Sequence, residues 1–329
     1  MQKLFQQFNN LNILIIGDVM MDSYLWGSVE RISPEAPVPV VSVRKKENRL
    51  GGAANVALNI QALGANPIIC AVIGDDKEGD EFLCILQDNN LPTQGILKLN
   101  TRPTTVKTRV IAHNQQVVRI DAEVDEELPL DESQKLVAII EQIINDQKID
   151  AIVFEDYDKG VISEYLIQAI VQIATSKSII TVVDPKKRNF LNYKGVTLFK
   201  PNLKELREGL KLDIDSKNHQ ELQSAVQDLQ DKLNAEMIMV TLSEQGVYMH
   251  SNNGKKVIPA HIRKIADVSG AGDTVIATTV VCLATGLDLF TTAAIANLAG
   301  GLVCQSVGVV PVNKEELLAE VKSLQLSNN

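Results

Sequence analysis

Residues 151–185, "AIVFEDYDKGVISEYLIQAIVQIATSKSIITVVDP", contain the unit from which the fold follows. Two short runs, 151–156 and 179–185, are almost continuously apolar, which is typical of strands that are covered on both faces. Between them, residues 163–177 carry the pattern of a helix. A strand, a helix and a second strand in this order predict a parallel βαβ unit.

The same alternation of strands and helices runs through most of the chain. Further strands are predicted at 12–19, 66–74, 195–202 and 236–243. Helices are predicted at 53–64, 220–233, 272–286, 290–306 and 313–325. We therefore expect a doubly wound, mostly parallel α/β sheet flanked by helices, formed by residues 1–329 as a single domain.

Two stretches interrupt this alternation. Residues 22–50 and 104–121 carry alternating β-branched side chains without a helical period. We interpret them as a small β-lid that projects from the main sheet, and ordinary edge strands are the alternative. The apolar segment "APVPVV", residues 36–41, suits pairing across a two-fold axis, so a homodimer formed through the lid is expected.

Composition excludes several classes of function. The net charge of −9 argues against a general nucleic-acid binder. The four cysteines form no CxxC pair and the four histidines are isolated, so neither a zinc site nor a histidine-based metal site is expected. No apolar run approaches the roughly 20 residues of a membrane span, and no signal-peptide cleavage site is present. A cytoplasmic protein is therefore expected.

Polar residues stand where five of the predicted strands end. They are Asp18, Asp156, Asp184, Asn202 and Ser243. In open α/β sheets the ligand crevice lies just beyond the carboxyl ends of the strands. Any one of these residues is as often only a helix cap, but five together favour a ligand site.

The stretch "ADVSGAGDTVIA", residues 266–277, predicts the chemistry of that site. Successive small residues at the start of a helix leave backbone N–H groups unpaired, which makes an anion site. Asp273 at the mouth of such a site could accept the proton of a hydroxyl that attacks a bound phosphorus. A capped helix after a glycine turn is the structural alternative. Neither the P-loop string GxxxxGK[ST] nor the dinucleotide fingerprint GxGxxG is present here, which weakens an oxidoreductase interpretation.

Four segments together resemble the ribokinase-like (PfkB) carbohydrate kinases. "DVSGAGDT" (267–274) resembles their C-terminal signature, and "GGAANVALNIQALG" (51–64) resembles their N-terminal signature. "KPNLKE" (200–205) matches their Asn-x-x-Glu element, and "VTLSEQGV" (240–247) matches their nucleotide-side strand and turn. The segments occur in family order and extend over nearly the whole chain.

Within that family, two segments closely resemble bacterial heptose-7-phosphate kinases, the kinase half of the ADP-heptose synthesis enzymes. They are "GDVMMDSYLWGSVERISPEAPVPVV" (17–41) and "RPTTVKTRVIAHNQQVVRID" (102–121). The resemblance implies ATP-dependent phosphorylation of D-glycero-β-D-manno-heptose 7-phosphate at C1, which feeds ADP-heptose into lipopolysaccharide core synthesis. Because no HxGH-type motif of a nucleotidyltransferase occurs, we expect the kinase alone.

Two alternatives remain open at this point. The catalytic centre does not separate heptose from ribose, fructose or fructose 6-phosphate, so a kinase for another sugar is one of them. The other is a binding or regulatory protein that kept the fold and lost the chemistry. Intact Asp273, Gly270, Gly272, Asn202 and Glu205 argue against the second alternative.

The resemblance also implies roles for individual residues. Asp273 would be the catalytic base, and an anion hole would be formed by the amides of Gly270, Ala271 and Gly272. Asn202 and Glu205 would organise Mg²⁺ through water. ATP would be bound by Thr241, Ser243, Gly246 and Asn297. Asp267 and Ser269 correspond to a monovalent-cation loop, but "SVGVV" (306–310) lacks the usual Thr after "VG", which leaves K⁺ dependence open. Glu155 replaces the usual small residue before "DY".

The sugar phosphate would be held by polar groups near its hydroxyls and by cations near its phosphate. The sugar hydroxyls would be bound by Asp18, Asp22, Gly51, Gly52 and Asn55. The candidate phosphate ligands are Lys107, Arg109, Arg119, Lys159 and Lys186.

Overall fold

The central sheet of the protein is mostly parallel. The computed structural model of the chain describes residues 1–113, 115–261 and 263–327. Within these residues the main sheet has the strand order β13-β12-β11-β10-β9-β8-β1-β4-β5, in which only β12 and β13 run antiparallel to their neighbours. Its strands are β1 (Asn12–Gly17), β4 (Asn66–Gly74), β5 (Ile96–Leu99), β8 (Ala151–Glu155), β9 (Ile180–Asp184), β10 (Leu198–Phe199), β11 (Met237–Thr241), β12 (Val247–Ser251) and β13 (Gly254–Ile258). The predicted doubly wound α/β sheet is confirmed.

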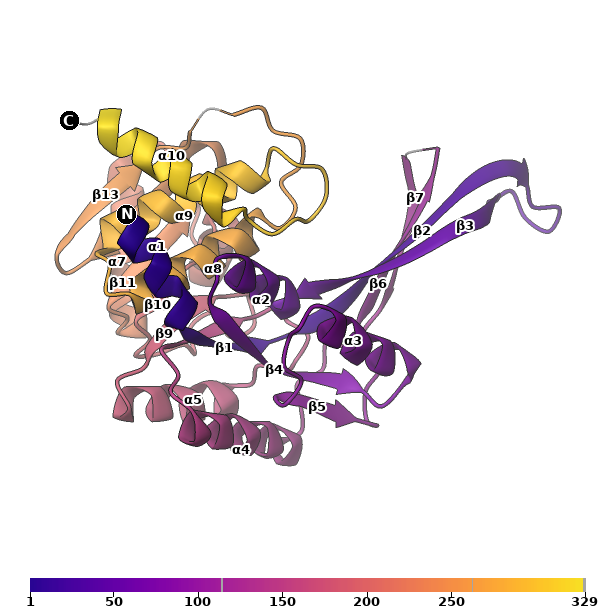
Figure 1. Cartoon of the computed structure of the whole chain (residues 1–329), viewed down its shortest axis with the longest axis horizontal. Helices are drawn as coiled ribbons and strands as arrows, with labels where there is room; N and C mark the ends of the chain where they lie inside the picture. The colour runs from indigo at the N-terminus through magenta and orange to yellow at the C-terminus, as the bar shows by residue number, and fades with distance from the viewer. Residues whose placement is uncertain (114, 262, 328–329) are drawn as a thin grey trace.

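Helices cover both faces of this sheet (Figure 1). One apolar cluster packs α1 (Gln2–Gln7), α2 (Ala53–Ala62), α3 (Lys77–Asp88), α8 (Ala271–Ala284), α9 (Leu289–Val303) and α10 (Lys314–Ser327) against one face. A second cluster packs α4 (Leu130–Asp146), α5 (Glu164–Ser176), α6 (Leu203–Leu210) and α7 (His219–Leu233) against the other. The central strands β1 and β8 are buried almost throughout and are mostly apolar, as the sequence indicates.

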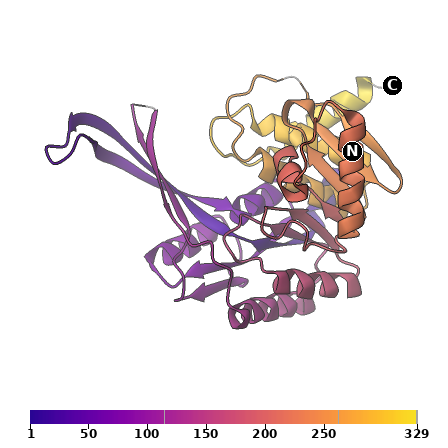
Figure 2. The same ribbon diagram turned by 180° about the vertical axis from the view of Figure 1, so that it is seen from behind.

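The lid is a separate four-stranded sheet in the order β3-β2-β6-β7. Its strands are β2 (Val19–Ile32), β3 (Pro39–Gly52), β6 (Val106–Ala112) and β7 (Gln115–Ala122). Both views show it projecting from one side of the helix-covered body (Figures 1 and 2). The lid prediction is confirmed, and the edge-strand alternative is wrong because these strands pair with one another rather than with the main sheet.

The register of the central strands aligns their polar ends. Glu155 on β8 pairs with Gly17 on β1 and with Asp184 on β9. Asp18 and Asp156 follow one residue after β1 and β8. The carboxyl ends of these strands therefore bring several carboxylates to one edge, as expected for an open α/β sheet.

The structure differs from the sequence prediction in a few elements. The predicted strand at 195–202 is reduced to the two residues of β10; after it, Lys200 pairs with Asp184 and Asn202 caps the next helix. The sequence prediction does not include α3 or α4. In α4 the buried residues form a clear stripe that includes Leu136, Ile140 and Ile143. In the described part of the chain, no helix is long and apolar enough to cross a membrane.

Candidate active site

The first turn of α8 offers unpaired backbone amides. Gly270 stands at the N-cap in a left-handed conformation with φ of +80°. Among the described residues, the amides of Gly270, Gly272 and Asp273 have no hydrogen-bond partner. The amide of Ala271 differs from the prediction, because it donates to the Val268 carbonyl at 3.3 Å. A Cβ atom on Gly272 would meet no atom within 4 Å, so open space lies in front of this turn.

Asp273 is held by two side chains from distant parts of the sequence. Asn55 Nδ2 donates to its Oδ2 at 2.5 Å, and Tyr157 Oη donates to its Oδ1 at 2.9 Å. Burial raises the pKa of Asp273, while these two hydrogen bonds lower it. A carboxylate that is oriented from both sides and partly desolvated is a suitable general base. Tyr157 was not predicted, although it belongs to the conspicuous "DYDKG" segment.

A network of charged groups lies beneath this carboxylate. Lys200 Nζ and Asp184 Oδ2 form a buried ion pair at 2.8 Å, and Lys186 Nζ contacts Glu205 Oε1 at 2.6 Å. Burial lowers the pKa of Lys186 and Lys200, but the neighbouring carboxylates outweigh it, so the pKa of both lysines is raised. The positive charges in this network are therefore retained at neutral pH.

Glu155 is a buried carboxyl group in the same network. Burial raises its pKa well above the usual range, and the charges of Asp184 and Asp273 raise it further. Its Oε2 atom has no hydrogen-bond partner among the described residues. On the neighbouring strand a side chain at Gly17 would clash with the Glu155 carbonyl, so the glycine accommodates this close approach of the two strands. Glu155 is therefore favoured in its neutral form, which avoids a further negative charge beside Asp273.

Asp18 anchors the loop that carries Tyr157. Its carboxylate accepts the amides of Tyr157 at 2.8 Å, Lys159 at 3.1 Å and Val161 at 3.2 Å, and the residue is 1% exposed. The prediction for Asp18 was a contact with sugar hydroxyls. That contact stays a prediction; in the structure the carboxylate accepts three backbone amides and thereby positions Tyr157 and Lys159.

The base of the lid comes close to the sheet edge. Asp22 Oδ1 accepts a hydrogen bond from Arg109 Nη1 at 2.5 Å, so this predicted pair of site residues is joined. A Cβ atom on Gly51 would lie 2.7 Å from Asp22 Oδ2. Gly52 has φ of +60°, and a side chain there would clash with the Asp18 carbonyl. Both glycines allow the end of β3 to pack against the first carboxylates of the site.

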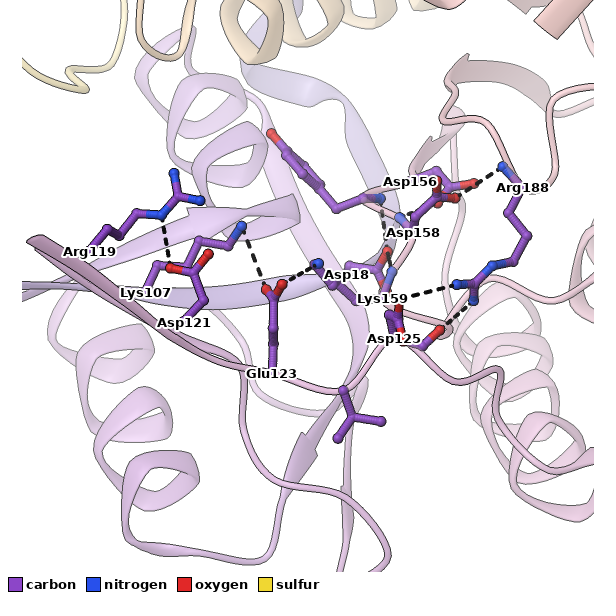
Figure 3. Close-up of polar contacts among 12 residues, drawn as sticks. Asp18, Lys107, Arg119, Asp121, Glu123, Asp125, Asp156, Asp158, Lys159 and Arg188 are labelled. Atoms are coloured by element: carbon purple, nitrogen blue, oxygen red, sulfur yellow. Dashed lines mark hydrogen bonds and ion pairs between the residues drawn. The ribbon is translucent and has the colours of Figure 1, made fainter. Parts of the chain in front are cut away.

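The other predicted phosphate ligands also have acidic partners (Figure 3). Lys159 Nζ lies 2.7 Å from Glu123 Oε1, and Lys107 Nζ lies 3.6 Å from Glu123 Oε2. Arg119 pairs with Asp121 on the lid at 2.9 Å. Glu123 was missed by the sequence analysis, and its only signal is the acidic stretch "DAEVDEE" that follows the lid.

Asn202 and Glu205 form a capping box at the start of α6. Asn202 Oδ1 accepts the Glu205 amide at 2.8 Å, and Glu205 Oε2 accepts the Asn202 amide at 2.8 Å. Among the described residues no group of three His, Cys, Asp or Glu side chains is placed to hold a metal ion. These two residues thus form no closed set of direct ligands, and their contact with Mg²⁺ through water stays a prediction.

The predicted nucleotide-side turn follows β11. Thr241 ends that strand and bridges to Asn202. Ser243 and Gly246 both have positive φ, and the Leu242 amide donates to the Gly246 carbonyl at 2.8 Å. A side chain at Gly246 would clash with the Ile258 carbonyl, so this position requires glycine.

Two further predicted ligands form hydrogen bonds with nearby protein groups. The side-chain amide of Asn297 on α9 donates to the Pro259 carbonyl at 2.8 Å. Asp267 accepts the amide and hydroxyl of Ser269 at 3.0 and 2.8 Å, and the amide of Gly308 at 3.0 Å. These donors lower the pKa of Asp267. Its carboxylate thus joins the turn before α8 to the segment around Gly308.

Comparison with known proteins identifies the family. Residues 10–316 match the sequence model described as "pfkB family carbohydrate kinase". The chain belongs to the pfkB family. As a pfkB carbohydrate kinase it is a phosphotransferase, and membership implies ATP and usually a divalent metal ion.

Curated relatives and solved structures agree with this membership. A bifunctional protein HldE from Methylobacillus flagellatus is 42% identical over 95% of this chain, and one from Helicobacter pylori is 41% identical over 93%. This chain spans about two thirds of the length of these relatives, 64% and 65% respectively. Phosphofructokinase-2 from Escherichia coli, solved with potassium, superposes with a TM-score of 0.77 at 20% identity, over 96% of this chain and 99% of that one.

Proposed function

We propose that this pfkB kinase transfers a phosphoryl group from ATP to the C1 hydroxyl of D-glycero-β-D-manno-heptose 7-phosphate, giving the 1,7-bisphosphate. The observation that carries the proposal is the position of Asp273. Its carboxylate is oriented by Asn55 and Tyr157 beside the unpaired amides of the α8 turn. A base and an anion site so close together suit the transfer of a phosphoryl group to a hydroxyl.

The residues divide the work of this reaction. Asp273 accepts the proton of the attacking hydroxyl. The amides of Gly270 and Gly272 stabilise the charge that develops on the transferred group, and Ala271 contributes by placing them at the helix start. Mg²⁺, held through water by Asn202 and Glu205, would neutralise charge on the nucleotide phosphates. Positioning of the two substrates supplies much of the remaining acceleration.

The choice of heptose 7-phosphate rests on several supports. Residues 17–41 and 102–121 resemble heptose-7-phosphate kinases, and relatives at about 40% identity carry the name HldE. The lysines at 107 and 159 converge at the base of the lid, which fits a sugar that already bears a phosphate. Fructose 6-phosphate shares this feature, whereas ribose and fructose lack it.

Two finer proposals accompany the reaction. A homodimer formed through the lid is supported by the apolar side chains that the lid leaves exposed. Stimulation by K⁺ is supported by the likeness of the Asp267 and Ser269 turn to the family loop. The hydrogen bonds of the Asp267 carboxylate add no support, because its oxygens already accept protein donors. Activity measured in K⁺ against Na⁺ at equal ionic strength tests the second proposal.

The reaction is tested by measuring ADP release with Mg·ATP and four sugars: heptose 7-phosphate, ribose, fructose and fructose 6-phosphate. We expect turnover selective for heptose 7-phosphate, and a loss of about 10²–10⁴-fold in Asp273→Asn. The matched control is Asp288→Asn at the N-cap of α9, where an asparagine still accepts the amides of Phe290 and Thr291.

Each outcome has a separate meaning. Selectivity for another sugar would retain the base and overturn the heptose assignment. A folded Asp273→Asn variant with nearly the activity of the Asp288→Asn control would overturn the role of Asp273.

A further inference from the structure

Two lysines from separate segments converge on a single carboxylate. Lys107 lies on lid strand β6, and Lys159 lies in the loop after β8. Figure 3 shows Glu123 between them, with Oε1 at 2.7 Å from Lys159 Nζ and Oε2 at 3.6 Å from Lys107 Nζ. The side chains are only 18%, 16% and 23% exposed for Lys107, Lys159 and Glu123. The triad is therefore largely withdrawn from water.

The hydrogen bonding of Glu123 is incomplete. Its Oε2 atom is buried and has no hydrogen-bond partner among the described residues, because 3.6 Å to Lys107 is too long for a good hydrogen bond. In the described chain, no backbone amide donates to this carboxylate. Among the described residues the two ammonium groups alone hold it, and without Glu123 they would be partly buried with no counter-ion in that part of the chain, which is costly.

The backbone around the triad is anchored without the Glu123 side chain. Arg102 Nη2 donates to the carbonyl of Val124, the residue after Glu123, and to the carbonyl of Lys159 itself. Asp18 accepts the Lys159 amide. The Glu123 side chain can therefore leave the lysines by rotating about its own bonds, while the two segments stay in place.

The triad lies on the same loop as a contact of the proposed base. Tyr157 donates its hydroxyl to Asp273, and Lys159 follows two residues later, at most about 7 Å away along the backbone. A sugar whose reacting hydroxyl is at Asp273 could extend its far end toward the lysines. This geometry connects the triad with the phosphate end of the proposed substrate.

We propose that Glu123 holds the place of the substrate's distal phosphate between Lys107 and Lys159, and that a phosphorylated sugar must displace it. This inference rests on the proposed function, because it concerns the phosphate end of that substrate. A phosphate dianion carries more charge and more acceptor oxygens than a carboxylate, so it competes successfully for two ammonium groups. A neutral sugar end cannot do so. Glu123 thus acts as a specificity-determining residue against sugars without the phosphate.

The test measures the dissociation constant of inorganic phosphate by titration calorimetry. We expect Glu123→Gln to bind phosphate about fivefold more tightly or better, because the competing charge is removed. In kinase assays the same variant should lower the KM for the phosphorylated sugar by a larger factor than it changes kcat. Asp125→Asn is the matched control, since it also removes one negative charge and lies two residues from Glu123. The Asp125 side chain is 70% exposed and pairs with Arg188 at 3.9 Å.

The outcomes separate this inference from the proposed function. If Lys107→Ala and Lys159→Ala weaken phosphate binding but Glu123→Gln does not tighten it, Glu123 is only structural and the inference is wrong. If neither lysine variant affects phosphate binding, the phosphate end of the proposed function fails as well. A structure of the unsubstituted chain with phosphate decides without any variant: Glu123 still bound to both lysines would overturn the inference, and Glu123 turned away would support it.

Discussion

The surroundings of Asp273 show how single residues set the chemistry of this kinase. Asn55 and Tyr157 each occupy one carboxylate oxygen, and Asp18 fixes the loop from which Tyr157 reaches over. Tyr157 acts through Asp273 in this arrangement, because it donates to the carboxylate of the proposed base, and is a positioning residue. Its hydroxyl stabilises the charged form of Asp273, which is the form that accepts a proton.

Tyr157→Phe should therefore change the pH profile. Without the donated hydrogen bond the pKa of Asp273 rises further, so the acid limb of the kcat/KM profile moves to higher pH. At pH 7 we expect kcat/KM to fall about threefold to tenfold. Tyr193→Phe is the matched control, because it removes a buried hydroxyl that donates to Asp156 instead. An acid limb that is equally placed in both variants would contradict the role of Tyr157.

Asp156 predicts how stability depends on pH. Burial raises its pKa to about 7 from 3.8, and the charge of Asp18 adds to this effect. Between these values the folded state holds a proton that the unfolded chain releases, so the free energy of unfolding falls as the pH rises through this window. From pH 6 to pH 8 the titration of this residue should lower the free energy of unfolding by about 1 kcal/mol.

Asp156→Asn removes that titration. Urea unfolding at several pH values should show a shallower decline in stability from pH 6 to pH 8 than in the unsubstituted protein. The exposed Asp131→Asn should retain the original decline, since its side chain is 70% exposed. Parallel curves for all three proteins would show that Asp156 does not titrate in this range.

Among the elements, α6 combines a structural cap with the proposed magnesium site. Its capping box uses the same two residues that the family motif assigns to the metal. The sequence "NLKE" was therefore interpretable in both ways, because an asparagine followed three positions later by a glutamate serves either purpose. The contact between Lys186 and Glu205 joins this helix to the charged network.

Asn202→Ala separates the two roles. We expect the free energy of unfolding to fall by about 1 kcal/mol, as for other lost N-caps. Asn218→Ala is the matched control, because Asn218 caps α7 by accepting the amides of Gln220 and Glu221. Both variants should lose similar stability, but only Asn202→Ala should need more Mg²⁺ for half-maximal activity. Equal Mg²⁺ requirements would leave Asn202 as a helix cap alone.

At the scale of the whole molecule, the lid is the part whose surface lacks a covering layer. Every residue of β7 is exposed, and the lid exposes six large apolar side chains in the described residues: Ile32, Val38, Val43, Val117, Val118 and Ile120. Apolar side chains exposed in this number on one small sheet are typical of a surface that pairs with another chain. The proposed partner is a second copy of this chain.

Ile120→Lys should therefore dissociate the proposed dimer. A lysine among the exposed apolar side chains of edge strand β7 would place a charge in the contact, and sedimentation velocity should show a shift from dimer to monomer. Leu130→Lys is the control, because Leu130 is 58% exposed at the start of α4, outside the lid sheet. A protein that is monomeric before any substitution would contradict the dimer, whereas dissociation in both variants would contradict the role of the lid.

The sequence by itself determined the α/β sheet, the lid segments and the family. These features follow from local patterns: apolar runs, helical periods and the chemistry of consecutive residues such as Gly270, Ala271, Gly272 and Asp273. The predicted helices at 53–64 and 163–177 match α2 and α5 to within two residues, and α5 begins directly after its N-cap Ser163, whose hydroxyl accepts the Leu166 amide.

Only the tertiary structure decided which groups meet at the site. Tyr157 and Asp273 are 116 positions apart, Asn55 and Asp273 are 218 apart, and Lys159 lies 36 positions from Glu123. No local pattern encodes such pairs, because they depend on which strands lie side by side in the folded sheet. The same assembly turns Asp18 toward backbone amides and places Glu123 between two lysines. The residue types that do the chemistry are thus local, while their partners and their charge states are set by long-range packing and burial.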